Sequence, residues 1–332
     1  MSRIRAKDFD VIEMSGQTLQ VRLWGRIFLL QMESELFKTE LLRLLPLMDG
    51  RHEAEELVSQ SRLPPEELRT ILDTLRNMSL IETVEGLGHG DDAPPEEYLS
   101  EHAALFRVFE SSKTKSSASC QRRAFTQRIA LAGSDGLSDE LARLLPAYGL
   151  TRVRRLSPAA LGEAADPTEL VVVSLSTYSD LETLTALNRR CVDQGRTLIP
   201  ISFDDGVAQI GPTVVPGKTA CLQCLDLRTM SNIDNLEAYE TYRGFVKARE
   251  RRYPEVPAHV TAIAVFACHE VLRVVTGYDQ AKSYNGVLKV DLWNADVRRT
   301  RVLKFPSCTV CSPRARRPKY DNHAFASMLA QL

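Results

Sequence analysis

The sequence predicts an α/β fold in which a small N-terminal unit of strands and helices precedes a larger domain with a mostly parallel sheet. Strand and helix patterns cluster within residues 1–90, and a stretch rich in Gly, Pro and Ser follows at 91–126. From residue 127 onward, strand and helix patterns alternate, which is typical of a parallel sheet covered by helices. The 332 residues suffice for two or three domains, and 44% apolar content is that of a folded chain.

Residues 1–90 are expected to form a winged helix-turn-helix. QTLQVRLW and GRIFLLQ meet at a tight turn, Trp24-Gly25, and predict a hairpin. Apolar residues at three-to-four spacing predict a helix from Phe37 to Met48, and a short helix is expected at 53–60. A third helix begins at Pro64-Pro65, and SLIETVEG follows as a wing strand. The third helix repeats four apolar side chains on one face: Leu68, Ile71, Leu72 and Leu75.

Residues 91–126 are expected to be a linker with one short helix, and residues 127–332 to form the second domain. The predicted strands of that domain are RIALAG, TRVRRL, ELVVVSLS and TLIPIS, with KVDLW and RVLKF as a final antiparallel pair. Helices are expected at 138–148, 180–194 and 260–276.

Four of the seven cysteines occur as two CxxC pairs, CLQC and CTVC. Each pair presents two thiolates from one turn, so the spacing predicts a closed, structural Zn²⁺ site with no chemistry of its own. The predicted ligands are Cys221, Cys224, Cys308 and Cys311. Redox use of a single pair is the alternative. Cys191 and Cys268 lie in apolar helical stretches and are expected in the core, whereas Cys120 is expected at the surface of the linker.

Charge and hydropathy exclude several classes of partner. With 42 basic and 43 acidic residues, no global charge favours nucleic acid. No signal peptide is evident, and His269, Glu270 and Arg273 interrupt the apolar run at 260–275, so no membrane span and a cytoplasmic location are expected. One local basic run, from Arg298 to Lys319, could meet an acidic partner or be a solvated tail.

The stretch IGPTVVPGKTACLQCLDLR with the later CTVC resembles the ThiF/MoeB (ubiquitin-activating) superfamily, and specifically the ThiF-like proteins of azole and azoline peptide biosynthesis. LNRRCVDQGRTLIPIS and ACHEVLRVVTG support the resemblance, which covers roughly residues 127–320. It implies a Rossmann-type domain, a homodimer and a role beside a YcaO-type cyclodehydratase.

The superfamily adenylates a carboxylate and needs a glycine-rich turn that lets backbone N–H groups approach phosphate. Here that turn reads ALAGSDGLSDEL, and Asp135 and Asp139 would repel a triphosphate. Arg154 and Arg155 stand where an acidic ribose ligand is expected, and SLSTYSD offers Ser176, Thr177 and a displaced Asp180 in place of a magnesium ligand. The sequence therefore predicts a degenerate nucleotide site that does not bind ATP.

A winged helix-turn-helix can bind DNA, but residues 1–86 carry 15 acidic and 11 basic side chains, which disfavours a duplex. The unit resembles PqqD-like recognition elements of peptide-modifying systems, in which a leader peptide adds a strand to the hairpin and packs on the third helix. The leucines could equally belong to the core. The predicted peptide-binding residues are Arg26, Ile27, Phe28, Leu29, Leu30, Gln31, Leu68, Arg69, Leu72, Leu75 and Arg76.

These features predict a leader-peptide-binding, non-catalytic partner of a YcaO-type cyclodehydratase in ribosomal peptide (thiazole/oxazole) biosynthesis, which recruits the precursor peptide to that enzyme. The alternative is an ATP-dependent enzyme that adenylates a peptide carboxylate. A transcription regulator with a ligand-sensing body is a third interpretation, which the acidic first unit disfavours. The histidines at 259 and 269 have no nucleophile spaced beside them and are expected to be structural.

Overall fold

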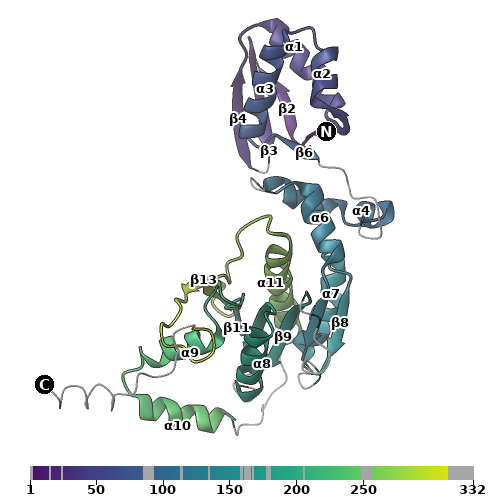
Figure 1. The fold of residues 1–332 in the computed structure, drawn as a ribbon. Helices are drawn as coiled ribbons and strands as arrows, with labels where there is room; N and C mark the ends of the chain where they lie inside the picture. The colour runs from purple at the N-terminus through teal and green to yellow at the C-terminus, as the bar shows by residue number, and fades with distance from the viewer. Residues whose placement is uncertain are drawn as a thin grey trace, which may run out of the picture. The chain divides into compact units, whose positions relative to one another are not determined.

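The computed structural model of the chain divides into two compact units (Figure 1). Unit 1 comprises Met1–Thr126 with Leu272–Asp279, and unit 2 comprises Gln127–Val271 with Gln280–Leu332. The residues that the structure describes are 3–14, 16–23, 25–84, 93–112, 115–133, 135–157, 160, 166, 168–176, 181–204, 206–247 and 256–312.

Unit 1 contains two three-stranded sheets and three helices between residues 3 and 84. One sheet has the order β2-β3-β4, and its hairpin strands confirm the predicted pair. The other has the order β5-β1-β6. The elements are β1 (Arg3–Ala6), β2 (Asp10–Glu13), β3 (Thr18–Leu23), β4 (Arg26–Gln31), α1 (Glu35–Leu44), a 3₁₀ turn (Leu45–Leu47), β5 (Asp49–Glu53), α2 (Ala54–Gln60), α3 (Pro65–Asn77) and β6 (Ile81–Val84).

Alternation along the hairpin decides which side of the β2-β3-β4 sheet is buried. Val21 and Leu30 point to the inner face, where they join the core that α1, α2 and α3 complete. α3 begins with Pro65 at its first turn, where a missing N–H costs nothing, and buries its leucines in this core. The outer face of the sheet stays exposed.

Residues 96–126 differ from the linker that the composition predicts. They form α4 (Glu96–Glu101), α5 (Ala103–Phe106), a 3₁₀ turn (Arg107–Ser111) and α6 (Ser117–Thr126), all within unit 1. Aromatic rings hold them together: the buried Tyr98 ring lies tilted against the buried Phe106 ring and edge-on to Phe125. Glu110, also buried, accepts hydrogen bonds from Arg5 at 2.5 Å and from the Asp8 backbone N–H at 2.7 Å. These buried rings and charges, spaced too irregularly to show a period, explain why composition missed the packing.

Unit 2 is built on a mixed seven-stranded sheet with the order β13-β12-β11-β10-β9-β7-β8. The four strands β8, β7, β9 and β10 are parallel, as predicted, and the other three are antiparallel. The strands are β7 (Ile129–Ala132), β8 (Val153–Leu156), β9 (Leu170–Ser176), β10 (Leu198–Asp204), β11 (Val207–Ile210), β12 (Gly286–Asp291) and β13 (Asp296–Arg301). The last strand, β13, ends at Arg301, the first residue of the predicted RVLKF segment, so it lies earlier in the chain than predicted.

The helices of unit 2 are α7 (Gly136–Ala147), α8 (Leu181–Asp193), α9 (Leu222–Met230), α10 (Leu236–Lys247) and most of α11 (Pro257–Thr276). α11 is long and apolar enough to cross a membrane by length and composition, but a single helix of this kind is weak evidence for a span and is also typical of a buried core helix. Half of its most apolar window is buried, and Ile263, Ala267 and Cys268 have no exposed surface. α11 therefore fits the pattern of a core helix.

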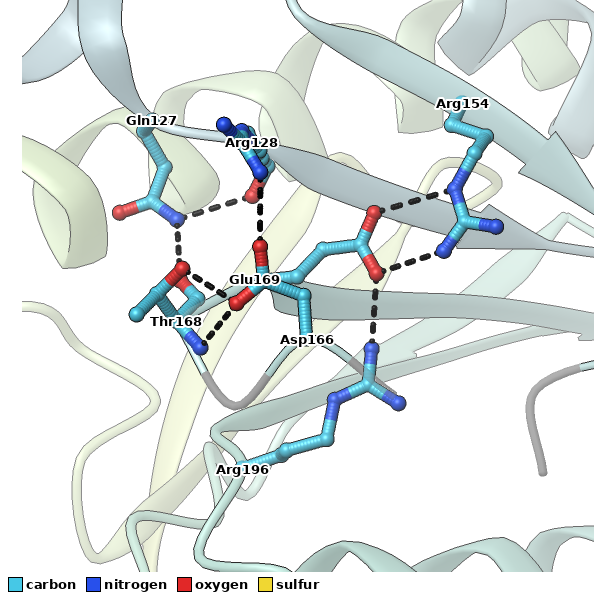
Figure 2. Close-up of polar contacts among 7 residues, drawn as sticks. All are labelled: Gln127, Arg128, Arg154, Asp166, Thr168, Glu169 and Arg196. Carbon is cyan, nitrogen blue, oxygen red and sulfur yellow. Dashed lines mark hydrogen bonds and ion pairs between the residues drawn. The ribbon is translucent and has the colours of Figure 1, made fainter. Parts of the chain in front are cut away.

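A polar cluster lies at the amino-terminal edge of the parallel strands (Figure 2). Glu169, which precedes β9, is almost completely buried and accepts hydrogen bonds from Arg154 at 2.9 Å and from Arg196 at 3.0 Å. Beside it, Arg128 pairs with Asp166 at 2.9 Å. Arg196 is as deeply buried as Glu169, so each charge depends on the other for solvation that water cannot supply.

Removing the buried carboxylate should therefore destabilise unit 2. We expect Glu169→Ala to lower the free energy of unfolding by about 3 kcal/mol, because it removes a buried carboxylate that accepts hydrogen bonds from the Arg154 and Arg196 guanidinium groups. Asp139→Ala, which breaks the exposed pair between Asp139 and Arg155, is the control and should cost less than about 1 kcal/mol. Urea denaturation of the full chain measures both values. Equal losses for the two variants would contradict the importance of this pair.

Candidate functional site

The four predicted metal ligands come together in unit 2. The Sγ atoms of Cys221, Cys224, Cys308 and Cys311 all lie within 4.8 Å of one another. The Cys221 sulfur is 3.9 Å from that of Cys224 and 3.7 Å from that of Cys308, and the sulfurs of Cys224 and Cys311 are 3.4 Å apart. Tetrahedral zinc with bonds near 2.3 Å requires sulfur separations of about 3.8 Å. The donor set and its spacing therefore fit a tetrahedral metal ion.

The local fold holds these sulfurs in place. Cys221 is the N-cap of α9, so the first helical turn carries Cys224 to the same side. The Phe305 backbone N–H donates a hydrogen bond to the Cys224 sulfur at 3.3 Å. Hydrogen bonds from the thiols of Cys221 and Cys311 lower the pKa of Cys224, so this group of sulfurs favours a thiolate. The cluster joins the segment 305–311 to the core of the sheet.

The remaining three cysteines are buried. This confirms the prediction for Cys191 and Cys268, whereas the expected surface position of Cys120 is wrong, because α6 places it in the core of unit 1. Burial raises the pKa of Cys120 and of Cys191 to about 11, and that of Cys268 to about 12. Thiols with such pKa values stay protonated near neutral pH and are poor nucleophiles.

The loop between β7 and α7 is where a nucleotide phosphate would approach in this class of fold. Gly133 has φ +153°, and a Cβ there would lie 2.6 Å from the Ser174 carbonyl oxygen, so the glycine is required for close packing. Asp135 is the N-cap of α7. Its carboxylate accepts hydrogen bonds from the Ser138 N–H at 2.8 Å and from the Ser174 hydroxyl at 2.9 Å. The chain's own carboxylate thus occupies the anion-binding terminus of α7.

Other residues near this loop that differ from the expected nucleotide-site pattern form ion pairs in the structure. Arg155 pairs with Asp139 in the first turn of α7 at 2.5 Å, and Arg154 pairs with Glu169. Neither arginine replaces the missing ribose ligand. Three positions of the expected nucleotide site, 134, 177 and 180, lie outside the described residues, and only the backbone of Ser176 is described. Ser174 could not be predicted from local patterns, because its role comes from a contact with a residue 39 positions away.

In unit 1, the predicted peptide-binding strand β4 lies at the edge of its sheet. The Met32 N–H donates to the Gln17 carbonyl at 2.9 Å, so these two residues form a hydrogen-bonded pair between β3 and β4. Along an antiparallel ladder, every second residue of a strand forms such a pair, and the residues between point their backbone groups the other way. Ile27, Leu29 and Gln31 therefore direct their backbone N–H and C=O groups to the open edge. Ile27 is 57% exposed and Leu29 63% exposed, so the predicted open apolar face is present. Phe28 and Leu30 instead belong to the core side, and the guanidinium of Arg26 lies over the Phe28 ring.

The structure separates the predicted α3 residues into two groups. Leu68, Leu72 and Leu75 are buried in the core, so the alternative of core leucines holds for all three. Arg69 and Arg76 are exposed but pair with Glu55 and Asp73 respectively. Such exposed pairs contribute little and can exchange for other carboxylates.

Two exposed residues of β2 were missed by the sequence reasoning. Ile12 pairs across β3 with Gln20, which in turn pairs with Leu29, so Ile12 shares the outer face with Leu29. Met14, directly after β2, is exposed as well. The alternation in DVIEM predicts this exposure, because it places Ile12 and Met14 on one face of the strand and Val11 and Glu13 on the opposite face.

We expect the purified protein to contain about one zinc ion per chain, as a four-cysteine site binds zinc and leaves no open coordination position. Cys308→Ser should lose the metal and lower the melting temperature, because the metal holds the 305–311 segment to the sheet. Elemental analysis and thermal unfolding measure both effects. Cys268→Ala, at a buried cysteine outside the cluster, should keep its zinc. A metal-free protein, or a zinc content unchanged by Cys308→Ser, would contradict the assignment.

Comparison with solved structures shows the fold shared with two kinds of protein. A heterocyclase in complex with substrate and cofactor superposes with a TM-score of 0.67 at 19% identity, covering 95% of this chain and 40% of that chain. The heterocyclase TruD superposes with a TM-score of 0.67 at 16% identity, over 98% of this chain and 47% of TruD. This chain thus spans less than half the length of either heterocyclase.

The third structure is similar in length to this chain. Escherichia coli MccB superposes with a TM-score of 0.66 at 14% identity, over 95% of this chain and 98% of MccB. No curated protein sequence matches the chain. The model of the ThiF family matches residues 168–310, a range that begins after the Gly133 loop and includes three of the four clustered cysteines. Residues 168–310 of this chain therefore form a ThiF family domain.

Proposed function

We propose that the chain is a leader-peptide-binding, non-catalytic partner of a YcaO-type cyclodehydratase in the biosynthesis of ribosomal peptides with thiazole or oxazole rings. The single observation that carries this proposal is the Asp135 carboxylate at the amino terminus of α7. A nucleotide phosphate would compete with it for the same N–H groups and meet its negative charge at short range. In the described part of this loop, the α7 terminus is the anion site that adenylation would use.

Unit 1 supplies the surface for the leader peptide. An extended peptide that pairs with β4 would satisfy the outward backbone groups of Ile27, Leu29 and Gln31. Its apolar side chains would cover Ile27 and Leu29, which are otherwise exposed to water. Acidic residues of the leader could exchange into the exposed ion pairs of Arg69 and Arg76. This role of the edge agrees with the predicted PqqD-like recognition element.

Tethering accounts for the benefit of such a partner without any chemistry of its own. A precursor peptide held by its leader presents its core to the enzyme at an effective concentration of roughly millimolar. The structural comparisons support a role of this kind, because one neighbour is a heterocyclase with bound substrate and another is MccB in complex with N-formylated MccA. The four-cysteine cluster would hold structural Zn²⁺, and the chain would act in the cytoplasm as a homodimer.

The second candidate is an enzyme that adenylates a peptide carboxylate. MccB matches the length of this chain, and one MccB structure contains AMPCPP together with MccA. ATP–pyrophosphate exchange in the presence of the precursor peptide separates the two candidates. We expect no exchange above background, because Asp135 occupies the phosphate position. Exchange that depends on both ATP and the peptide would establish the adenylating enzyme.

Leader binding is tested at the open edge of β4. We expect Leu29→Glu to weaken binding of the cognate leader to the full chain at least about tenfold, because it places a charge where apolar contacts form. Leu36→Glu, at an exposed apolar residue of α1, is the matched control and should leave affinity unchanged. Fluorescence anisotropy with the labelled leader measures both. If the leader does not bind the wild-type chain at tens of micromolar, or binds both variants equally well, leader recognition by β4 is wrong.

A further inference from the structure

The ThiF domain has its own open strand edge, at β13. Among the described residues, β13 pairs only with β12 and lies at the end of the seven-stranded sheet. The Val302 N–H donates to the Asn285 carbonyl at 2.9 Å, which fixes the alternation of hydrogen-bonded pairs along the ladder. Val297, Arg299 and Arg301 therefore direct their backbone N–H and C=O groups away from the sheet. These groups can receive a further strand.

This edge is positively charged. Arg298, Arg299, Thr300 and Arg301 are all exposed, and Lys304 follows the strand. The guanidinium of Arg299 donates to the carbonyl oxygens of Lys282 and Tyr284, and the ammonium of Lys304 donates to the Gly217 carbonyl. Hydrogen bonds to carbonyl oxygens position these side chains without neutralising them. Among the described residues of the strand, Arg298 alone forms an ion pair with an acidic residue of the strand, Asp296. The edge thus attracts carboxylates.

Next to the edge, the turn between β12 and β13 presents Trp293 with 65% of its surface exposed. The indole is nevertheless held in place. It packs on Gly206, where an added Cβ would lie 2.3 Å from the indole Nε1, and it meets the His259 ring edge-on with centroids 4.7 Å apart. The Leu292 N–H also donates to the Gly206 carbonyl at 2.9 Å, which joins the two turns. An exposed Trp that is already ordered loses little entropy on binding, and Trp is common among the residues that dominate interfaces.

Charged side chains on an edge strand often serve only to prevent edge-to-edge aggregation. That explanation accounts for the arginines but not for an exposed Trp held by two other segments. Single-stranded nucleic acid also binds to surfaces with arginines and an aromatic ring. Outward N–H and C=O groups at alternate residues match the backbone of a polypeptide strand, whereas a phosphodiester chain offers no donors to pair with the carbonyl groups.

We propose that the β13 edge and Trp293 bind an extended, acidic segment of a partner protein by β-augmentation. Backbone groups of the segment pair with Val297, Arg299 and Arg301, its carboxylates lie beside the exposed guanidinium groups, and an apolar side chain covers Trp293. This site lies in the ThiF domain and does not depend on leader binding at β4. It assigns a role to the basic run that begins at Arg298.

The test uses the full chain and a defined probe, a fluorescein-labelled peptide of about 12 residues in which Glu alternates with Val. This length allows a strand to pair with β13 and leaves flanking residues on either side. We expect saturable binding, measured by fluorescence anisotropy. Arg298→Glu with Arg301→Glu, and separately Trp293→Ala, should each weaken it at least about tenfold. Arg189→Glu with Arg190→Glu, the same change of charge at exposed residues of α8, is the control and should retain most of the affinity.

Two further probes distinguish the kind of ligand. A peptide with N-methyl groups on alternate amides should lose at least about tenfold in affinity if main-chain hydrogen bonds are made. An oligothymidylate of similar length should bind more weakly than the acidic peptide. The proposal is overturned if the acidic peptide does not bind, if the β13 and α8 variants lose affinity equally, if N-methylation has no effect, or if the oligothymidylate binds more tightly.

Discussion

The amino terminus of α7 can stabilise one anion, and the chain provides that anion itself. Asp135 accepts from the Ser138 N–H and from the Ser174 hydroxyl, so its carboxylate lies at the helix terminus where a phosphate would accept hydrogen bonds. An intramolecular carboxylate is always present at high effective concentration, whereas a nucleotide would have to displace it and tolerate its charge. In the proposed function, the α/β architecture is kept while the chain's own carboxylate occupies the terminus of α7.

What the fold retains is a rigid frame that presents strand edges. In unit 2, the buried pair of Glu169 with Arg196 lies at the amino-terminal ends of the parallel strands (Figure 2). The cysteine cluster joins the segment 305–311 to the sheet. β4 in unit 1 and β13 in unit 2 are edge strands with different side chains. β4 is apolar, with Ile27 and Leu29 exposed, and β13 is basic with an ordered Trp beside it. Edges of such different character favour different polypeptides, so one chain could hold two partners without competition.

Local sequence patterns predicted the elements whose stability is local. The hairpin, α3 and the parallel strands follow from alternation or from a helical period, and the CxxC spacing identified the four cysteines that form the cluster. Contacts between distant positions could not be predicted in this way. Ser174 gains its role from Asp135, and Cys120 is buried although its neighbours are Ser-rich, because aromatic residues elsewhere in 96–126 complete the core. Periodicity alone could not show that Leu68, Leu72 and Leu75 are wholly buried while Leu29 remains exposed, since burial depends on which elements pack against a face.

The central claim is that this chain binds polypeptides and does not bind nucleotide at the α7 terminus. Isothermal titration of the zinc-loaded full chain with Mg·AMPCPP tests it most directly, with and without saturating leader peptide. The account predicts no saturable heat in either titration, while the leader itself binds. Saturable, stoichiometric binding of the nucleotide to the wild-type chain would show that the terminus still accepts phosphate and would contradict the account.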